Sequence, residues 1–471
     1  MASNNDLVSL LHENQEIPLS KRLKIVYELS LPGILAQISE IIMQYIDAAM
    51  VGVLGAEASA SIGLVSSSTW LFGGVIGGAA SGFAVQVAHA VGAGDQNRSK
   101  RIFRESLLTS ILIGIVIGVL GMALSFYLPS LLGADHSLWK DATAYFFWFA
   151  AFLPVRMLQR LAMNMLQCAG NMKTPSILST LMCALDVVFN YFLIFPTRTV
   201  VILSQKITMP GAGLGVLGAQ LGTSFAIAVC MVLLLYYCFF KEQSLSYHGI
   251  KGHWLPEKET LTQAVHIGLP MALEQTATTG AQVFSTRIVA PLGTTAIAAN
   301  SFAVTAESIC YMPGYGIGMA STTMVGQAIG AKRKDLARSF AWLTTFAGMI
   351  IMSITGILMY FLCPYVFAFL TPVKDVQTLG EEVLRIELLA EPMFAASIVA
   401  AGALRGAGDT LVPGIMNLVS IWGVRITLAY VLSKTLGLRG VWVAMASELT
   451  FRGIIFLIRL KRERWLKNLP D

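Results

Sequence analysis

The sequence repeats itself at a fixed offset, and the repeated positions fall within apolar segments. The matched pairs, each at an offset of 238, are Pro32/Pro270, Gln37/Gln275, Gln44/Gln282, Gly55/Gly293, Gly92/Gly330, Pro154/Pro392, Gly170/Gly408 and Pro175/Pro413. Constant spacing over this distance predicts two similar helical halves. Duplicated membrane bundles are the usual architecture of secondary transporters, in which one half moves against the other. Transport is therefore the first functional hypothesis.

The composition predicts a polytopic membrane protein. Hydrophobic residues make up 55% of the chain and charged residues 13%, against roughly 25% charged residues in a typical soluble domain. Segments long enough to cross a bilayer, about 20 residues each, lie near 26–52, 62–90, 106–132, 140–162, 175–196, 213–240, 262–291, 296–325, 339–364, 382–404, 412–434 and 438–459. We expect an all-α fold with twelve transmembrane helices in two pseudo-symmetric six-helix lobes.

Lysine and arginine residues predict the orientation, because cytoplasmic loops carry an excess of positive charge. They cluster before the first segment, after the second, sixth and eighth segments, and at the end of the chain. We expect a multi-pass protein of the plasma (inner) membrane with both termini cytoplasmic. Topology and contact with anionic lipid explain the net charge of +6, so nucleic acid is not an expected partner.

The expected domains follow from the same pattern. They are an N-terminal segment at 1–25, a lobe at 26–240, a cytoplasmic linker at 241–260, a second lobe at 261–460 and a tail at 461–471. The first half has 16 additional residues between Phe195 and Gly211, since Gly218 matches Gly440 at an offset of only 222. We expect an exterior loop there. The six cysteines lack CxxC spacing, which indicates neither disulfides nor a bound cofactor.

Polar residues at membrane depth are the first functional candidates, because such residues usually face a cavity or a partner. In the first segment they are Gln37, Glu40, Gln44 and Asp47. Their spacing predicts one polar helix face, about 15 Å long. That face lines either a water-filled cavity or a buried polar contact between helices.

The fifth segment carries Asp186 and Asn190 four residues apart, on one predicted face. Counted from the cytoplasmic helix ends, Asp186 and Asn190 lie about 16 and 22 Å along their helix, and Glu40 and Asp47 lie about 21 and 31 Å along theirs. We expect one pocket in the middle and outer part of the first half, with Thr223 of the sixth segment adding a hydroxyl.

The second half keeps the polar positions but changes their charges. The seventh segment carries Glu274, Gln275, Thr278 and Gln282, and its acid lies one turn nearer the cytoplasm than the position equivalent to Glu40. We therefore expect two unequal cavities. Glu307 in the eighth segment has either a gating or substrate role or a structural hydrogen bond.

The other charged residues have structural interpretations. Glu448 and Arg452 lie four apart and are expected to pair. Glu387, Glu391, Arg287 and Arg425 are expected either to form interhelical pairs or to line a cavity. We expect Arg156 near the cytoplasmic end of the fourth segment, with its side chain extended toward the interface, and His89 as a solvated residue at a helix end.

Four motifs in order give a family resemblance. They are Pro32 with the repeat, the run from Ile46 to Gly52 (IDAAMVG), the run from Val325 to Ala331 (VGQAIGA), and the run from Leu404 to Thr410 (LRGAGDT) followed by Pro413. Together they resemble the multidrug and toxic compound extrusion (MATE) family over nearly the whole chain.

The resemblance implies two lobes around a V-shaped cavity and export of organic cations, driven by inward flow of protons or sodium ions. Asp47 matches the first-helix acid that members use for coupling. The order Asp186 then Asn190 reverses the usual order in the fifth helix, and Glu274 lies four residues before the usual acid position, here Thr278. The branch of the family and the coupling ion stay open.

The resulting site prediction has two parts. Ion coupling is assigned to Asp47, Asp186 and Asn190, which are also the candidate sodium ligands, with Glu40 and Thr223. The substrate cavity is assigned to Gln37, Gln44, Glu274, Gln275, Thr278, Gln282 and Glu307. The expected partners are small organic cations and the lipid bilayer, and a monomer should suffice. The alternative function is a flippase for lipid-linked oligosaccharides. An enzyme is not expected, because no nucleophile–base pair or metal motif is present.

Overall fold

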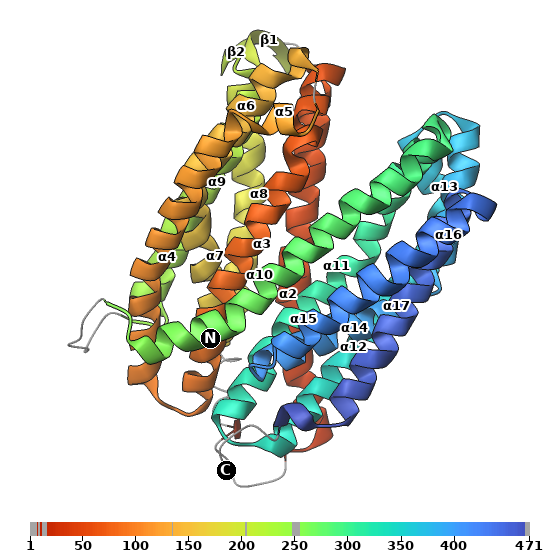
Figure 1. The fold of residues 1–471 in the computed structure, drawn as a ribbon. Coiled ribbons are helices and arrows are strands. Elements are labelled where there is room, and N and C mark those ends of the chain that lie inside the picture. The colour runs from red at the N-terminus through yellow and green to blue at the C-terminus, as the bar shows by residue number, and fades with distance from the viewer. Residues whose placement is uncertain are drawn as a thin grey trace.

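The computed structural model describes residues 7, 10–11, 17–133, 135–202, 205–246 and 255–466. Part of the expected linker, 247–254, and the tail from 467 onward lie outside these residues. Two groups of long helices converge at one end, where α2 begins and α17 ends, and diverge toward the other, where β1 and β2 lie (Figure 1). We call these ends the base and the hairpin end.

The first half contains eight helices and a hairpin in the described residues. Their bounds are α2 (Leu19–Gly52), α3 (Ala56–Gly92), α4 (Gln96–Ser125), α5 (Leu128–Leu131), α6 (His136–Ala151), α7 (Leu153–Cys168), α8 (Lys173–Ile194), β1 (Pro196–Ile202), β2 (Gln205–Ala212) and α9 (Gly215–Tyr236), which is continued by the π-helical segment η1 (Tyr237–Lys241).

The second half follows the same order without the hairpin. Its elements are α10 (Lys258–Val289), η2 (Ala290–Leu292), α11 (Thr294–Gly330), α12 (Lys334–Leu370), α13 (Lys374–Leu388), α14 (Glu391–Gly406), α15 (Leu411–Leu418), the π-helical segment η3 (Val419–Ile426), α16 (Thr427–Leu436), α17 (Leu438–Lys461) and η4 (Arg464–Leu466).

Helix boundaries confirm the repeat. The starts of α3, α4, α6, α7 and α8 each recur at the offset that separates Pro32 from Pro270, at the starts of α11, α12, α13, α14 and α15. The turns before α8 and α15 also match, since Gly170 and Gly408 have φ angles of 93° and 82°. Glycine adopts this left-handed backbone without steric strain.

The twelve expected spans are present. Eight described helical segments are long and apolar enough to cross a membrane. The other four spans are α10 and α11, which are long but more polar, and two broken spans, α6–α7 and α13–α14. Pro154 and Pro392 lie in the first turns of α7 and α14. Proline is favoured in the first turn of a helix and weakens a helix interior, because it has no amide hydrogen to donate, so both breaks fall where a proline is best accommodated.

The additional residues of the first half form a β-hairpin. β1 and β2 pair antiparallel, from Pro196 opposite Ala212 to Ile202 opposite Gln205. Gly213 N donates to Phe195 O at 3.0 Å, and this bond joins the two strands where the hairpin meets α8 and α9. The segment therefore lies between α8 and α9 as predicted, although it is a hairpin rather than an irregular loop.

The first helix of each half crosses to the opposite lobe at the base. The start of α2 places Ile25 and Val26 in an apolar cluster with Phe340 of α12. In α10, Ala264 belongs to the apolar core of the first lobe, and Gln86 of α3 donates to Thr260 O at 3.1 Å. The lobes are therefore interlocked at the base and separate toward the hairpin end (Figure 1).

Candidate functional site

An asparagine joins the two acids of the first lobe. Asn190 Nδ2 donates to Asp47 Oδ1 at 2.7 Å and to Asp186 Oδ2 at 3.1 Å. Asp186 and Asn190 are fully buried, while Asp47 is half-buried. The predicted contact between the first and fifth spans, α2 and α8, is therefore present.

Two oxygen atoms of this cluster lack partners. Asp186 Oδ1 and Asn190 Oδ1 are buried, and neither has a hydrogen-bond partner among the described residues. Buried polar atoms are usually satisfied, so each such atom requires an explanation. The two carboxyl groups also contact each other and the hydroxyl of Thr223. The arrangement provides oxygen ligands suitable for a proton or a small cation.

The sixth span, α9, closes the pocket with a glycine. A Cβ atom built on Gly222 would lie 2.0 Å from Asn190 Oδ1, so a larger residue at this position would displace the asparagine. The next residue, Thr223, donates its hydroxyl to Ala219 O at 3.1 Å. Its oxygen is thereby held on the face that meets the two acids.

The polar residues of α2 do not all face the same neighbour, contrary to the prediction of a single polar face. Gln37 Nε2 donates to Met319 Sδ of α11 at 3.4 Å, whereas Asp47 faces α8. Ten residues at about 100° each leave Gln37 and Asp47 about 80° apart around the helix. Glu40 is half-buried and seven residues from Asp47, about 10 Å along the axis. Gln44 is exposed.

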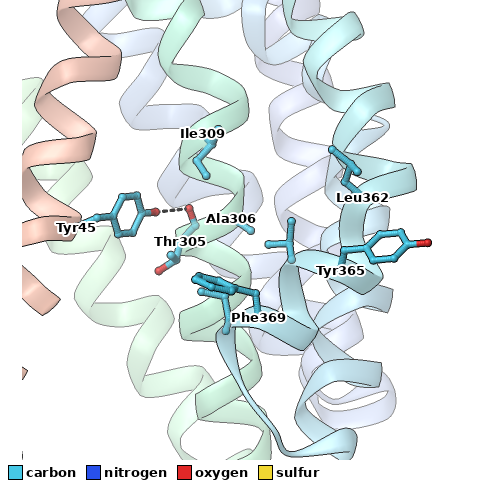
Figure 2. A pocket seen from close by; sticks show the side chains of 9 residues that line it. Tyr45, Thr305, Ala306, Ile309, Leu362, Tyr365 and Phe369 are labelled. Atoms are coloured by element: carbon cyan, nitrogen blue, oxygen red, sulfur yellow. Dashed lines mark hydrogen bonds between the residues drawn. The ribbon is translucent and has the colours of Figure 1, made fainter.

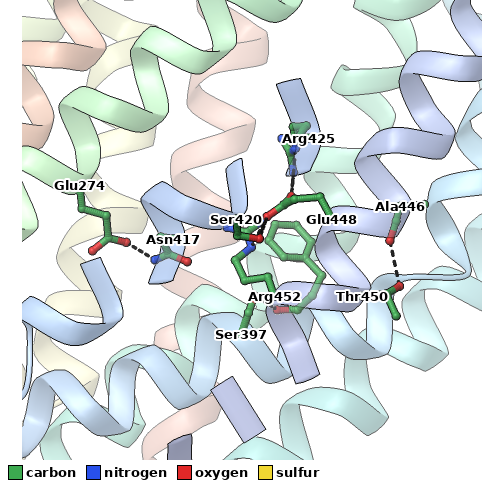
Figure 3. Close-up of polar contacts among 10 residues, drawn as sticks. Glu274, Ser397, Asn417, Ser420, Arg425, Ala446, Glu448, Thr450 and Arg452 are labelled. Carbon is green, nitrogen blue, oxygen red and sulfur yellow. Dashed lines mark hydrogen bonds and ion pairs between the residues drawn. The ribbon is translucent and has the colours of Figure 1, made fainter. Parts of the chain in front are cut away.

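The acid of the seventh span is paired. Arg405 Nη2 of α14 lies 3.0 Å from Glu274 Oε1 and 3.2 Å from Oε2. Asn417 of α15 also donates to this carboxylate (Figure 3). Sequence reasoning did not identify these partners. A base and an acid at matching depth, with Arg405 inside the LRGAGDT motif, were the available signal.

The remaining cavity candidates of α10 differ in surroundings. Thr278 donates to Glu274 O at 2.9 Å, and Gln282 is exposed. Gln275 packs across the interface on α3, where a Cβ built on Gly74 would lie 1.8 Å from Gln275 Cγ. These residues do not form one cluster with Glu307.

A buried ion cluster lies deeper in the second lobe. Glu448 of α17 is fully buried and accepts from Ser420 Oγ at 2.6 Å and from Arg425 Nη2 at 2.7 Å; Arg452 Nε lies 3.0 Å away (Figure 3). The predicted pair between Glu448 and Arg452 is confirmed. Ser420 and Arg425 lie in η3, and π-helical insertions often accompany functional sites.

Three other acids of the second lobe, Glu307, Glu387 and Glu391, interact with one another, and Glu307 also interacts electrostatically with Arg425 and Arg452. Glu387 and Glu391 are fully buried, and their carboxylate oxygens lack hydrogen-bond partners among the described residues. Both interact electrostatically with Glu307, which is 7% exposed. Among the described residues, the expected interhelical pair is present for Arg425 but not for Glu387 and Glu391.

Arg156 corrects another prediction. It lies twelve residues before the end of α7, about 18 Å from that end, rather than at the interface. Its guanidinium is 4.8 Å from the centroid of the Phe149 ring and interacts electrostatically with Asp47 and Asp186. The α7 helix continues beyond the predicted span, which explains the misplacement.

A groove between α2, α11 and α12 is apolar and separate from the acids. It has a volume of about 420 Å³ and includes Tyr45, Thr305, Tyr365 and Phe369 (Figure 2). Tyr45 OH donates to Thr305 O at 2.7 Å. Phe369 is 90% exposed, so lipid chains would cover this surface. No group of three or more His, Cys, Asp or Glu residues in the described ranges is placed to hold a metal ion.

Sequence comparison matches both halves to one family. The MatE family matches residues 32–192 and 270–431. A probable multidrug resistance protein NorM from Thermotoga maritima is 26% identical over 464 residues, which cover 96% of this chain and 95% of that protein. The multidrug resistance protein PmpM from Pseudomonas aeruginosa is 26% identical over 462 residues, 95% of this chain and 94% of that protein.

Solved structures share the fold. A MATE structure in the straight conformation has a TM-score of 0.86 and 20% identity, with 98% of each chain covered. The Vibrio cholerae MATE transporter VcmN has a TM-score of 0.84 and 17% identity, covering 100% of this chain and 99% of that one. With matches in both halves and a shared twelve-helix fold, the chain belongs to the MATE family of multi-pass membrane transporters.

Proposed function

We propose that this transporter exports amphipathic organic cations in exchange for protons or sodium ions. The main support for this proposal is the cluster of Asp47, Asn190 and Asp186, in which Asn190 donates hydrogen bonds of 2.7 Å and 3.1 Å to the two acids. Ionisable groups inside membrane spans usually serve transport when they face a cavity. The multidrug resistance names of the NorM and PmpM relatives support drug export.

The cluster supports binding of a small cation. Asp186 Oδ1 and Asn190 Oδ1 have no partner among the described residues, so a proton on the acid pair or a sodium ion between the oxygens would satisfy them. Binding of either ion would neutralise charge in the pocket and weaken its attraction for an organic cation. A ligand drives exchange only through such a difference in affinity between states.

The two lobes are proposed to move against each other so that the cavity between them opens alternately to the two sides of the membrane. Their divergence at the hairpin end and interlocking at the base (Figure 1) fit a state that is open at the hairpin end. Basic residues near the base, including Arg98, Arg101 and Arg338, support a cytoplasmic base by the positive-inside rule. We propose that the protein lies in the plasma membrane with both termini in the cytoplasm. We also propose that its lobes and linker have the boundaries given above and that the monomer is functional.

Transport in proteoliposomes tests the proposal. A pH gradient and a sodium gradient are imposed separately, and uptake of a fluorescent organic cation such as ethidium is followed. We expect accumulation against the dye gradient with one of the two ion gradients and none with neither. Movement of only anionic or lipid-linked compounds would instead support the flippase alternative.

Cross-linking at the hairpin end tests the motion. Leu54 lies in the turn between α2 and α3, and Thr294 is the first residue of α11, directly after the equivalent turn of the other lobe; both are exposed. A Leu54→Cys, Thr294→Cys variant, joined by a disulfide-containing cross-linker that spans the gap, should lose transport and regain it when the disulfide is reduced. Each single-cysteine variant is the control. Full activity in the cross-linked state would exclude alternating access by the lobes.

A further inference from the structure

Two hydrogen bonds cross between the lobes at the base, and the repeat relates them. His89 Nε2 of α3 donates to Gly406 O of α14 at 2.8 Å. Gln327 Nε2 of α11 donates to Cys168 O of α7 at 2.9 Å. Gln327 follows His89 by the offset of the repeat, and Gly406 follows Cys168 by the same offset. Each lobe therefore donates one bond and accepts the other.

The backbones around these bonds are in close contact. A Cβ built on Gly92 would lie 1.9 Å from Gln327 O, and one built on Gly330 would lie 1.9 Å from His89 O. These two glycines are one of the matched pairs of the repeat. Only glycine permits so close an approach. Each lobe therefore contributes one glycine that packs against the backbone of the other lobe.

The surroundings of the two bonds differ, because only the Gln327 bond has a second hydrogen bond beside it. Thr323 Oγ1, one turn before Gln327, donates to Gln167 O at 3.0 Å and adds a second bond beside the first. The position equivalent to Thr323 in the first half is Val85, which has no side-chain donor. His89 is half-buried, whereas Gln327 is fully buried. His89 is thus bound across the interface and is not the solvated residue predicted from sequence.

We propose that the His89–Gly406 and Gln327–Cys168 bonds form a paired latch that holds the base closed and must break for the lobes to open there. This inference rests on the proposed alternating access. The latch lies at the ends of α3, α7, α11 and α14, away from the Asp47 cluster. His89 and Gln327 act as positioning residues that favour one arrangement of the lobes over the other.

Hydrogen–deuterium exchange in lipid nanodiscs tests the latch on the whole protein. The peptides that report it cover the two accepting turns, residues 167–173 and 405–411. Each of His89→Ala and Gln327→Ala should speed exchange in both peptides about fivefold, the effect of one typical hydrogen bond. The double variant should speed it roughly 25-fold if the bonds act independently.

Two further variants separate a latch from local packing. Thr322→Val is the matched control, because Thr322 Oγ1 donates to Gly402 O at 2.8 Å within the second lobe; it should leave residues 167–173 unchanged. His89→Gln places the second half's donor in the first half and should keep exchange slow. Both of these expectations can be tested even if the double variant fails to fold.

The outcomes are decisive in either direction. Faster exchange at both turns from either single alanine variant supports the latch. Faster exchange only beside the substituted residue, or unchanged exchange at both turns, overturns it. Because exchange is measured without drug or ion gradient, this result is independent of whether organic cations are transported.

Discussion

The two lobes share a fold, but Asp47 and Asp186 of the first lobe and Glu448 of the second lobe have opposite surroundings. In the first lobe, Asp47 and Asp186 are joined by Asn190, and no arginine or lysine forms an ion pair with either acid among the described residues. In the second lobe, Glu448 is held by two arginines and a serine (Figure 3). A paired buried acid is fixed in its charge, whereas an unpaired one can exchange a cation.

The repeat sharpens this contrast. The positions of the second half equivalent to Asp47, Asp186, Asn190 and Thr223 are Ser285, Val424, Leu428 and Met445. The second lobe therefore lacks the side chains of the first lobe's pocket at the equivalent positions, and its ion cluster uses neighbouring ones. The repeated helices carry different ionisable groups in the two lobes.

Removing the charge at Asp47 should have the largest effect on transport. Asp47→Asn keeps a side chain of the same shape beside Asn190 but cannot release a proton or balance a sodium ion. We expect gradient-driven uptake of ethidium to fall more than about tenfold, which corresponds to about 1.4 kcal/mol. Uptake in proteoliposomes under an imposed ion gradient measures it.

A matched control separates coupling from folding. Glu57→Gln changes an exposed carboxylate at the start of α3 and should transport normally. Asp47→Asn should be inserted in the membrane as well as the wild type. Normal transport by both Asp47→Asn and Asp186→Asn would move the coupling site to the second lobe, where Glu307 is the next candidate.

Neutralising Glu448 should affect stability first. Glu448→Gln leaves Arg425 and Arg452 in the lobe without their counter-charge, and breaking a buried ion pair typically costs about 3–5 kcal/mol. We expect a large loss of thermal stability in detergent, measured by the melting of the monodisperse protein. Glu382→Gln is the control, because the Glu382–Arg439 pair is exposed and such pairs contribute about 0–1 kcal/mol. Equal stability of both variants would show that the cluster is not structural.

Ser420 should contribute a smaller share of the same cluster. Ser420→Ala removes the 2.6 Å bond to Glu448 and should cost about 1.5–3 kcal/mol, the usual range for a bond to a charged group. Thr450→Val is matched to it, because Thr450 Oγ1 donates only to Ala446 O in its own helix (Figure 3). Thermal melting should therefore distinguish the two, and identical melting would show that the Ser420 bond does not stabilise the protein.

Sequence predicted the features that depend on local pattern. The constant offset and the apolar segments indicated twelve spans, and helical spacing brought Asp47, Asp186 and Asn190 together. Neither could reveal contacts that depend on how distant helices pack. Arg405 pairs with Glu274 across 131 residues; the similar depth of the two residues permits this pairing but does not distinguish it from other pairings.

Errors of placement have a related cause. Hydropathy ends a span where polar residues begin, but α7 continues to Cys168, so Arg156 lies deeper than predicted. His89 was placed at a helix end correctly, yet its partner Gly406 belongs to the other lobe. Which helix end meets which is a property of the assembled lobes.

The smallest predicted effect lies outside the spans, at Glu242 just after η1. Asn171 Nδ2 donates to Glu242 Oε2 at 3.2 Å, but burial outweighs this bond and raises the pKa of Glu242 above its usual 4.5. The folded state therefore binds the proton more tightly than the unfolded state, so this contribution to stability is complete below about pH 4.5 and is lost as the pH rises through the folded pKa. Relative to Glu242→Gln, the wild type should lose thermal stability between pH 5 and pH 8. Melting curves of both proteins across this range measure the difference, and a wild type that gains stability relative to the variant would show that the Asn171 bond, rather than burial, dominates at this acid.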